Sequence, residues 1–323
     1  MSEEISLSII VPDSLAGKRL DQAVAELFPD YSRSRLTTWI KEGQLLVDGA
    51  AKRPRDKLLG GEKVEIHTAL EVIEEHKPQD IPLNIVYEDD HILVINKPAG
   101  LVVHPAPGHP DGTLLNALLH HCPDINQVPR AGIVHRLDMD TTGLMVVAKT
   151  IQAQTDLVDQ LQERTMGREY EAVVNQVMTG GGTVDEPMGR HSKNRQKMAV
   201  VGVGKEAVTH YRVLNKYRAH THIRLKLETG RTHQIRVHMA HINYPLVGDQ
   251  QYGGRFRLPP KITERLQETL RNFTRQALHA KRLELWHPET GELMSWEVDL
   301  PADMEKLLAV LKADASKHDD YTT

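Results

Sequence analysis

A short stretch near the first quarter of the chain determines how the rest can be organised. Residues 71–82, EVIEEHKPQDIP, are acidic, contain two prolines and follow neither a helical nor a strand period. Such a stretch presents no hydrophobic face, and it therefore predicts a linker. It separates a small N-terminal part, residues 1–70, from a much larger part that begins at residue 83. A chain of 323 residues is long enough for about two domains.

The composition predicts a soluble globular protein without a membrane anchor. Charged residues make up 26% and hydrophobic residues 40%, and no apolar run approaches the length of about 18 residues that spans a bilayer. The N-terminal sequence MSEEISLSII has no basic segment before an apolar one, so no export signal is expected. A single cysteine, Cys122, excludes an intrachain disulfide and any CxxC zinc site. We therefore expect a cytoplasmic protein.

The charge and the aromatic content limit how the chain can bind nucleic acid. The 40 basic and 44 acidic residues give a formal net charge of −4. Only 3 Trp, 8 Tyr and 3 Phe are present, which disfavours a sheet that stacks bases on a row of rings. Nucleic-acid binding would therefore require basic residues gathered locally.

The N-terminal part has the pattern of two short helices. Apolar residues at 20, 23, 24 and 27 form one helical stripe, and Pro29 ends it. Ser32 is a suitable N-cap for a second helix, whose stripe is Leu36, Trp39 and Ile40 and which Gly43 stops.

Two strands are predicted to follow, at 45–47 and around 64–66, with a turn at Asp48 and Gly49. The sequence GKRLDQAVAELFPDYSRSRLTTWIKEGQLLVDG resembles the S4 RNA-binding module. Basic residues are interleaved with the pattern, and the resemblance makes four of them candidate RNA contacts; a merely solvated basic face is the alternative. These candidates are Arg19, Arg33, Arg35 and Lys52.

The larger part mixes strands and helices in no strict order. Strands are predicted around 85–87, 92–95, 144–148, 168–174 and 223–227. Helices are predicted at 114–119 and at 151–161, the second capped by Thr150. This irregular order favours an α+β fold over a doubly wound parallel sheet.

Two polar clusters in this part have the residue types of a reactive site. The first is HRLDMDTTG, residues 135–143, directly before a predicted strand. A strand end can hold polar groups rigidly beside a pocket, although Asp and Gly there also suit a simple turn. The second cluster is GRTHQIRVHMAH, residues 230–241. If it is helical from Thr232 onward, Ile235, Met239 and Ile242 form its buried stripe, and Arg231 lies beside the helix N-terminus, where phosphate binds.

The histidines at 233, 238 and 241 raise the alternative of a metal hydrolase. The glutamate of an HExxH motif is missing, and no cysteine or carboxylate stands at ligand spacing. We therefore expect no metal, and activity that survives exhaustive chelation would exclude the hydrolase.

Three segments occur together in order: HRLDMDTTGLMVVAKT, REYEAVV and ETGRTHQIRVHMAHINYPLVGDQQYGG. They resemble the motifs of the RluA-type family of RNA pseudouridine synthases. The resemblance implies a catalytic domain over 83–310 with a central mixed, largely antiparallel sheet flanked by helices and loops, and a polar tail over 311–323. It also implies the site: Asp138 is the catalytic carboxylate, Tyr170 lies against the uracil, Arg236 pairs with the carboxylate, and Leu278 packs near the base. Met139 and Arg168 stand where the family often has lysine.

The resemblance implies cofactor-independent isomerisation of uridine to pseudouridine. The carboxylate acts either as a nucleophile at C1′ or as a base at C2′, and the sequence leaves both routes open. A permanently charged guanidinium beside it favours its ionised form. The target nucleotide must be flipped out of the helix, and Arg136 is the candidate to fill the vacated space or to hold flanking phosphates.

The expected partner is large-subunit (23S) ribosomal RNA, on its own or within a pre-ribosomal particle, with helix 69 as the target stem-loop and the protein a monomer. Basic residues outside the first module are candidate backbone contacts: Arg190, Lys193, Arg195, Arg231 and the strand pair Arg224 and Lys226. A solvated loop is the alternative for 190–197. The alternative function is a non-catalytic, S4-containing ribosome-assembly factor.

Overall fold

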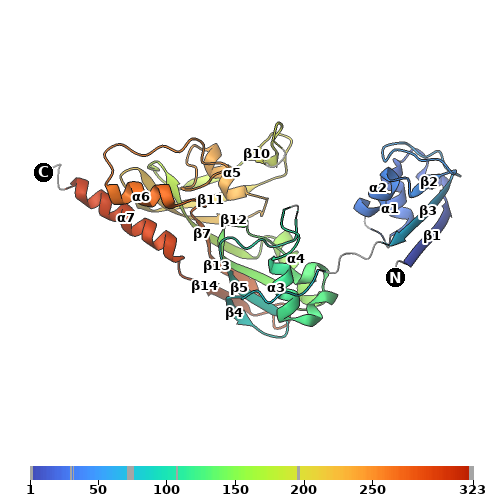
Figure 1. The fold of residues 1–323 in the computed structure, drawn as a ribbon, viewed down its shortest axis with the longest axis horizontal. Coiled ribbons are helices and arrows are strands. Elements are labelled where there is room, and N and C mark those ends of the chain that lie inside the picture. Colours follow the sequence, from blue (N-terminus) through green and yellow to red (C-terminus); the bar gives the residue numbers. More distant parts are fainter. Residues whose placement is uncertain are drawn as a thin grey trace. The chain divides into compact units, whose positions relative to one another are not determined.

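The computed structural model describes residues 3–29, 31, 33–70, 76–106, 108–194 and 197–319. It divides the chain into two compact units, Met1–Glu75 and His76–Thr323 (Figure 1). Within the described residues, no helix is long and apolar enough to cross a membrane. Ser32, the expected helix cap, and residues 71–75 of the expected linker lie outside the described residues.

The N-terminal unit packs two helices on a three-stranded antiparallel sheet. The helices are α1 (Leu20–Leu27) and α2 (Arg33–Lys41), as the apolar stripes predict. The sheet has the order β1-β3-β2, with β1 at Glu3–Ile10, β2 at Leu45–Val47 and β3 at Lys63–Leu70. The stripe residues of both helices pack in one core with these strands, all of them buried except Leu27, which is partly buried. The two helices and the two strands expected from the sequence are confirmed.

Strand β1 was not predicted, although its sequence alternates. Leu7 and Ile9 pack partly buried against the core, and Ser6 and Ser8 stand between them. Each residue of β1 pairs with β3 from Glu3↔Leu70 to Ile10↔Lys63. Alternation of apolar and polar residues is the sequence signal for such a half-buried strand.

The second unit is built on one nine-stranded sheet. Its order is β4-β5-β6-β13-β7-β12-β11-β8, and β14 pairs with β13. The pair β6 and β13 is parallel and the other pairs are antiparallel, which confirms the mixed, largely antiparallel α+β fold. The strands are β4 (Ile85–Glu88), β5 (Ile92–Lys97), β6 (Thr142–Ala148), β7 (Gly167–Asn175), β8 (Gly182–Asp185), β11 (Val208–Lys216), β12 (His220–Leu227), β13 (Leu278–Trp286) and β14 (Leu293–Glu297).

Helices and a small hairpin surround this sheet. Thr150 caps its helix as predicted, since its Oγ1 accepts the backbone N–H of Ala153 at 3.1 Å. Helix α4 packs against β6 and β13, and α6 and α7 lie side by side (Figure 1). The helices are α3 (Leu114–His121), α4 (Ile151–Gln162), α5 (Gln234–His241), α6 (Glu264–Asn272) and α7 (Ala302–Asp319), and the hairpin is β9 (Met188–Arg190) with β10 (Met198–Val200).

The centre of the sheet is buried on both faces. In β5, Leu93 and Ile95 join one core cluster, while Ile92 and Val94 join another that includes the inner side of α4. Successive residues of a strand point to opposite faces, so an unbroken apolar run such as that of β5 indicates a strand covered twice. This burial makes the middle of the sheet a rigid support.

The C-terminal stretch differs from the polar tail expected over 311–323. Within the described residues, α7 continues to Asp319 and buries Val310, Leu311 and Asp314, which are each at most 2% exposed. Asp314 accepts the backbone N–H of Thr263 at 2.7 Å and an ion pair from Arg218 at 3.3 Å. A buried carboxylate with two partners belongs to the folded unit, so residues 311–319 are part of it.

Candidate active site

The loop that carries Asp138 is fixed by the sheet beneath it. Gly143, at the start of β6, has φ +114°, and a Cβ there would lie 2.3 Å from the carbonyl oxygen of Ala280 on β13. Only glycine permits this close parallel pairing. Thr142 Oγ1 lies 2.8 Å from His279 Nδ1, and Gln276 Nε2 donates to Thr141 Oγ1 at 3.0 Å. Asp138 therefore precedes a strand that is anchored to β13.

Lys97 holds the same loop from the opposite side, and its role was not predicted. Its side chain is fully buried, and its ammonium donates to three backbone carbonyls: Pro98 at 2.8 Å, Leu101 at 2.9 Å and Met139 at 2.7 Å. Burial lowers the pKa of Lys97 to about 8, against the opposing effect of the carboxylates Asp140 and Asp138. The contact with Met139 fixes the backbone immediately after Asp138.

Arg236 joins two carboxylates. Its Nη1 donates to Asp138 Oδ2 at 2.9 Å, as expected from the sequence. Its Nε and Nη2 donate to the two oxygens of Asp249 at 2.7 and 2.9 Å. Burial alone would lower the pKa of Arg236, but the bonds and charges of Asp249 and Asp138 outweigh burial and raise it. Asp249 was not predicted, and it makes the stronger, two-pronged contact.

A tight turn places Asp249. Gly248 has φ +74°, and a Cβ there would lie 2.1 Å from the carbonyl oxygen of Arg275. The side chain of Asp249 is 0% exposed, and it also accepts the backbone N–H groups of Gln251 and Tyr252 at 2.9 and 3.0 Å. Burial opposes ionisation of Asp249, but the bond to Arg236 and these N–H groups dominate and lower its pKa. A Gly-Asp pair suits any turn, so the sequence does not single out this residue.

Helix α5 begins later than expected. It starts at Gln234 instead of Thr232, because His233 adopts a left-handed conformation with φ +57°. The Gln234 side chain anchors the start of the helix by accepting from Thr229 Oγ1 and donating to the carbonyl of Val208. Of the predicted stripe, Ile235 and Met239 are buried and Ile242 is partly buried. The helix start is thereby fastened to β11 and β12, which sets the position of Arg236.

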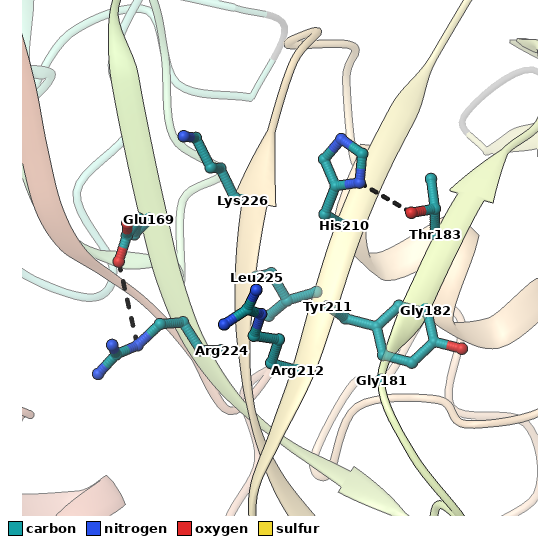
Figure 2. A pocket seen from close by; sticks show the side chains of 10 residues that line it. All are labelled: Glu169, Gly181, Gly182, Thr183, His210, Tyr211, Arg212, Arg224, Leu225 and Lys226. Carbon is teal, nitrogen blue, oxygen red and sulfur yellow. Dashed lines mark hydrogen bonds and ion pairs between the residues drawn. The ribbon is translucent and has the colours of Figure 1, made fainter.

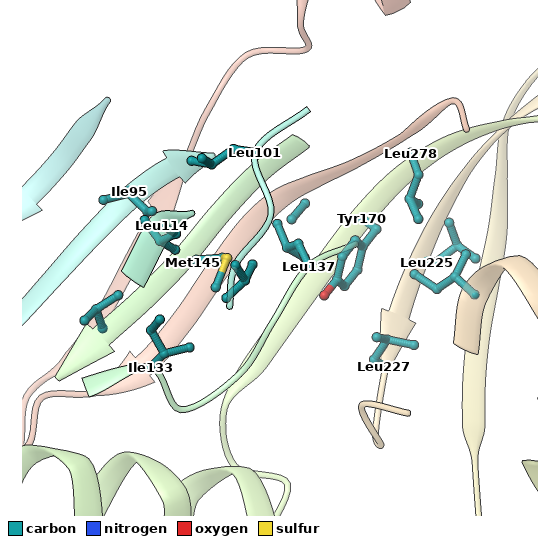
Figure 3. Packing of buried hydrophobic residues seen from close by; sticks show 14 of the residues in the cluster. Ile95, Leu101, Leu114, Ile133, Leu137, Met145, Tyr170, Leu225, Leu227 and Leu278 are labelled. Carbon is teal, nitrogen blue, oxygen red and sulfur yellow. The ribbon is translucent and has the colours of Figure 1, made fainter. Parts of the chain in front are cut away.

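Tyr170 and Leu278 lie in the main core cluster of the unit, near the Asp138 loop. Figure 3 shows the Tyr170 ring with Leu137 on one side and Leu278 and Leu227 on the other. Tyr170 is 6% exposed and Leu278 is 4% exposed. Burial raises the pKa of Tyr170, and the charge of Asp138 adds to the rise. The structure thus brings Tyr170, Leu278 and Asp138 into one region, as the sequence predicts.

A cavity of about 600 Å³ opens at Asp138 and is rich in arginine. The predicted residues Arg136 and Arg231 both line it. Arg130, on the same wall, follows a strained backbone with φ +56°, and non-glycine residues keep such angles where their surroundings enforce them. Five guanidinium groups therefore surround a single pocket that contains Asp138: Arg130, Arg136, Arg164, Arg168 and Arg231.

The histidines of α5 do not gather as metal ligands in the described part of the chain. His238 uses Nδ1 with Thr209 Oγ1 and Nε2 with the carbonyl of Glu186, at 2.9 and 3.0 Å. His233 Nδ1 lies 2.7 Å from the hydroxyl of Tyr252, and its Nε2 lies 3.8 Å from Asp138 Oδ1. The closest grouping of possible ligands in the described residues is elsewhere, at Glu88, His121 and Cys122, where Lys149 already pairs with Glu88 at 2.9 Å.

The basic candidates of the N-terminal unit divide into two kinds. Arg19 and Arg33 both bind the buried carboxylate of Asp21, at 3.0 and 2.8 Å, so part of their charge is balanced. Arg35 is half-buried on α2, and Lys52 is exposed in the loop between β2 and β3. The turn at Asp48 and Gly49 forms as expected, with φ +50° and +74°.

The basic candidates of the second unit lie in two places. Arg190 ends β9 and Lys193 is exposed in the hairpin loop, while Arg195 lies outside the described residues. Arg224 and Lys226 project from one face of β12 beside Arg212 of β11 (Figure 2). Arg224 is 3.3 Å from the buried Glu171, so this face is only partly positive.

The pocket combines a carboxylate that could react and guanidinium groups that could bind an anion. A carboxylate held by a guanidinium group stays available as a nucleophile or a base. The surrounding arginines offer charged donors to phosphate groups, although Arg164 is already paired with Glu206 and Glu228. Rigid attachment to β6, β13 and α5 keeps the reacting groups in position without a large ordering cost on binding.

The chain matches two protein families. Residues 91–241 match the family described as RNA pseudouridylate synthase, and residues 18–64 match the S4 domain. A Pseudomonas aeruginosa protein described as ribosomal large subunit pseudouridine synthase D is 64% identical over 314 residues, covering 97% of this chain and 98% of the relative. Relatives with the same description from Haemophilus influenzae and Escherichia coli (strain K12) are 60% and 58% identical, over 98% and 99% of this chain and 98% of each relative.

Solved structures agree with this similarity. The human RNA pseudouridylate synthase domain containing 4 superposes with a TM-score of 0.56 at 26% identity, covering 71% of this chain and 93% of that protein. The human domain containing 1 shares the fold with a TM-score of 0.52 at 24% identity, covering 73% of this chain and 96% of that protein.

Proposed function

Since the chain belongs to the RNA pseudouridylate synthase family, and is thus an isomerase that converts uridine to pseudouridine, we propose that it acts on large-subunit ribosomal RNA with Asp138 as its catalytic carboxylate. The observation that carries the proposal is the bond between Asp138 and Arg236 in an arginine-lined cavity. The relatives that match almost the whole chain are all described as ribosomal large subunit pseudouridine synthase D. We extend the proposal to the uridines of the helix 69 stem-loop.

In this proposal Asp138 carries out the isomerisation. The reaction breaks the bond between N1 and C1′, turns the uracil, and joins C5 to C1′ with loss of the C5 proton. Asp138 acts at the sugar, as a nucleophile at C1′ or as a base at C2′. Arg236 Nη1 donates to Asp138 Oδ2 at 2.9 Å and orients this carboxylate. Asp249 holds Arg236 in place, so Asp138 does not have to orient Arg236 in each turnover.

For the uracil we propose a place against Tyr170 and Leu278. Tyr170 offers a flat ring to the base, and Leu278 offers an apolar contact. Burial raises the pKa of Tyr170, so its hydroxyl carries a proton and can take up the C5 proton only while it passes its own proton to a second acceptor. The target nucleotide must leave its helix at a cost of a few kcal/mol. Arg136, on the cavity wall, is positioned to occupy the vacated space or to hold a flanking phosphate.

The N-terminal unit is assigned to RNA binding through Arg19, Arg33, Arg35 and Lys52. Salt-dependent contacts of this type hold the RNA backbone without reading its sequence. Arg190, Lys193, Arg195 and Arg231 extend the contact in the second unit. We propose that the protein acts in the cytoplasm as a monomer, on ribosomal RNA that is free or within a pre-ribosomal particle.

Tritium release tests the catalytic assignment. Ribosomal RNA labelled with tritium at C5 of uridine loses the label when the base is rejoined through C5. Wild-type protein is expected to release tritium, and Asp138→Asn is expected to bind the RNA and release none. Equal release by both proteins would exclude Asp138 as the catalytic carboxylate. Pseudouridine mapping in cells with and without the gene then tests helix 69: loss of pseudouridine at other sites alone would reject that substrate.

A further inference from the structure

A second cavity, of about 910 Å³, lies beside the Asp249 turn, and its lining does not include Asp138. One wall is the loop segment 253–259, and another is formed by residues 218–220 and 175–177 at strand ends. Residues 270–274, at and after the end of α6, complete it. The function proposed above uses none of this surface.

The cavity is strongly positive. Four arginines line it: Arg218, Arg255, Arg257 and Arg271. Its one lining carboxylate, Asp249, is fully buried and already bound by Arg236. Arg218 pairs with Asp314, but Arg255, Arg257 and Arg271 make no side-chain hydrogen bond or ion pair with any residue that the structure describes. Three guanidinium groups without a counter-charge attract a polyanion.

An aromatic ring stands between two of these arginines. Phe256 is one of 3 phenylalanines in the chain, and it is 60% exposed. Behind it the cavity floor is apolar, with Leu246, Val247 and Phe273 each less than 9% exposed. An exposed ring flanked by cations is the arrangement that binds single-stranded nucleic acid, because bases stack on the ring while the cations contact phosphates.

The loop that carries Phe256 is fastened at both ends. At its start, the backbone N–H of Gly253 donates to the carbonyl of Asp249 at 2.9 Å. At its end, Arg218 donates to the carbonyl of Pro260 at 2.9 Å, and the same arginine pairs with Asp314 of α7. The ring is therefore presented from a short, anchored loop, which limits the ordering cost of binding.

We propose that this cavity is a second RNA subsite, in which an unpaired base stacks on Phe256 and Arg255, Arg257 and Arg271 contact the adjoining phosphates. The inference rests on the proposed function, because that function makes RNA the substrate. RNA suits the cavity better than an acidic polypeptide, since a nucleotide supplies both a flat base for the ring and an anion for the arginines. The loop follows Asp249 in the sequence, so RNA bound here is positioned relative to the same residue that holds Arg236.

Titration of a ribosomal RNA fragment containing helix 69 tests the stacking contact. Phe256→Ala is expected to raise the Kd by about 5- to 150-fold, the range for loss of one stacked base. Phe256→Leu keeps the bulk without the aromatic face and is expected to behave like Phe256→Ala. Phe256→Trp is expected to bind within about twofold of wild type, because it keeps a stacking surface. An exposed side chain tolerates these changes, so circular dichroism should be unchanged.

The arginines are tested by the dependence of the Kd on salt. Arg255→Ala and Arg257→Ala are each expected to weaken binding and to reduce the slope of log Kd against log salt by about 1. Arg265→Ala is the matched control, because Arg265 is exposed on α6 but does not line the cavity. Slopes that fall equally in Arg265→Ala and in the cavity variants would contradict a specific subsite.

The two proposals fail in different ways. If wild-type protein releases tritium but the Phe256 and arginine variants bind RNA as wild type does, the subsite is wrong and the proposed function stands. If wild-type protein releases no tritium, the proposed function is wrong, and the titrations still decide whether RNA occupies the cavity. Loss of polyglutamate binding in the variants, with RNA binding unchanged, would assign the cavity to an acidic protein and overturn the RNA subsite.

Discussion

Asp249 binds Arg236 through two parallel hydrogen bonds of 2.7 and 2.9 Å, and this leaves Nη1 of the guanidinium directed at Asp138. Asp249, the outer carboxylate of this pair, therefore sets the direction of the hydrogen bond from Arg236 to Asp138. Without Asp249, the Arg236 side chain could adopt several rotamers, whereas a guanidinium group that is bound along one edge has a single orientation.

The first prediction concerns this outer carboxylate. Asp249→Asn keeps the shape of the side chain but removes its charge. Because breaking a buried ion pair costs about 3–5 kcal/mol, the free energy of unfolding should fall by that amount. The kcat for tritium release should fall at least tenfold, while the Kd for RNA changes little. Asp159→Asn, at an exposed position of α4, is the control and should alter neither the free energy of unfolding nor kcat. An unchanged kcat in a folded Asp249→Asn protein would show that Asp249 does not position Arg236.

Lys97 gives a second prediction. Lys97→Met fills the same space but leaves the carbonyls of Pro98, Leu101 and Met139 without their donor. A buried carbonyl without a partner costs about 1–3 kcal/mol, so the melting temperature should drop by several degrees. Hydrogen exchange at the backbone after Asp138 should become faster, and kcat should fall. Lys281→Met, which removes ion pairs with the exposed Glu297 and Asp299, should cost at most about 1 kcal/mol. Equal effects of the two changes would argue against the anchoring role.

Tyr170 gives a third prediction, which separates its ring from its hydroxyl. Tyr170→Phe keeps the flat face, so RNA should bind as it does to wild type. If the hydroxyl moves the C5 proton, the single-turnover rate of tritium release should fall by about 10²- to 10⁴-fold. Tyr170→Leu removes the ring as well and should also raise KM. A wild-type rate for Tyr170→Phe would leave the ring contact as the only contribution of Tyr170.

Buried histidines give a fourth prediction, on pH. Burial lowers the pKa of both His220 and His279 to about 4, from an unperturbed value near 6.5. Between these values the unfolded chain binds protons that the folded chain does not, so stability falls as the pH falls from 6.5 toward 4. From pH 7 to pH 5 each histidine should remove up to about 2 kcal/mol from the free energy of unfolding.

Urea titrations at the two pH values measure this change. The double variant His220→Gln and His279→Gln, which has no group to protonate at these positions, should show a smaller loss between pH 7 and pH 5. The same loss in wild type and the double variant would place the pH dependence at other groups.

The parts of the fold that the sequence predicts are those with a local signal. The stripe of α1, the Thr150 cap of α4 and the unbroken apolar run of β5 are each readable within about ten residues, and each element forms as expected. Strand β1 has the same kind of signal in its alternation. The order of strands in the large sheet has no such signal, since β13 pairs with β6 about 140 positions away in sequence, and only the packed core specifies that partner.

The residues of the candidate site also divide into those with a local sequence signal and those without one. The contact between Asp138 and Arg236, and the closeness of Tyr170 and Leu278, follow from motifs and form as expected. Asp249 and Lys97 act through other residues, by holding a guanidinium group and a backbone segment. A supporting role of this kind depends on distances between remote segments, so no local pattern identifies it.

The position of β13 in the middle of the sheet has a consequence for the newly made protein. Asp138 precedes β6 and Tyr170 lies on β7, and β13 is the strand between them. β13 ends at Trp286 and leaves the ribosome after both of its neighbours. Until β13 is in place, β6 and β7 have no strand between them. The active site therefore cannot assemble before β13 has been made, and a chain truncated before residue 278 is expected to be inactive although it carries every motif up to that point.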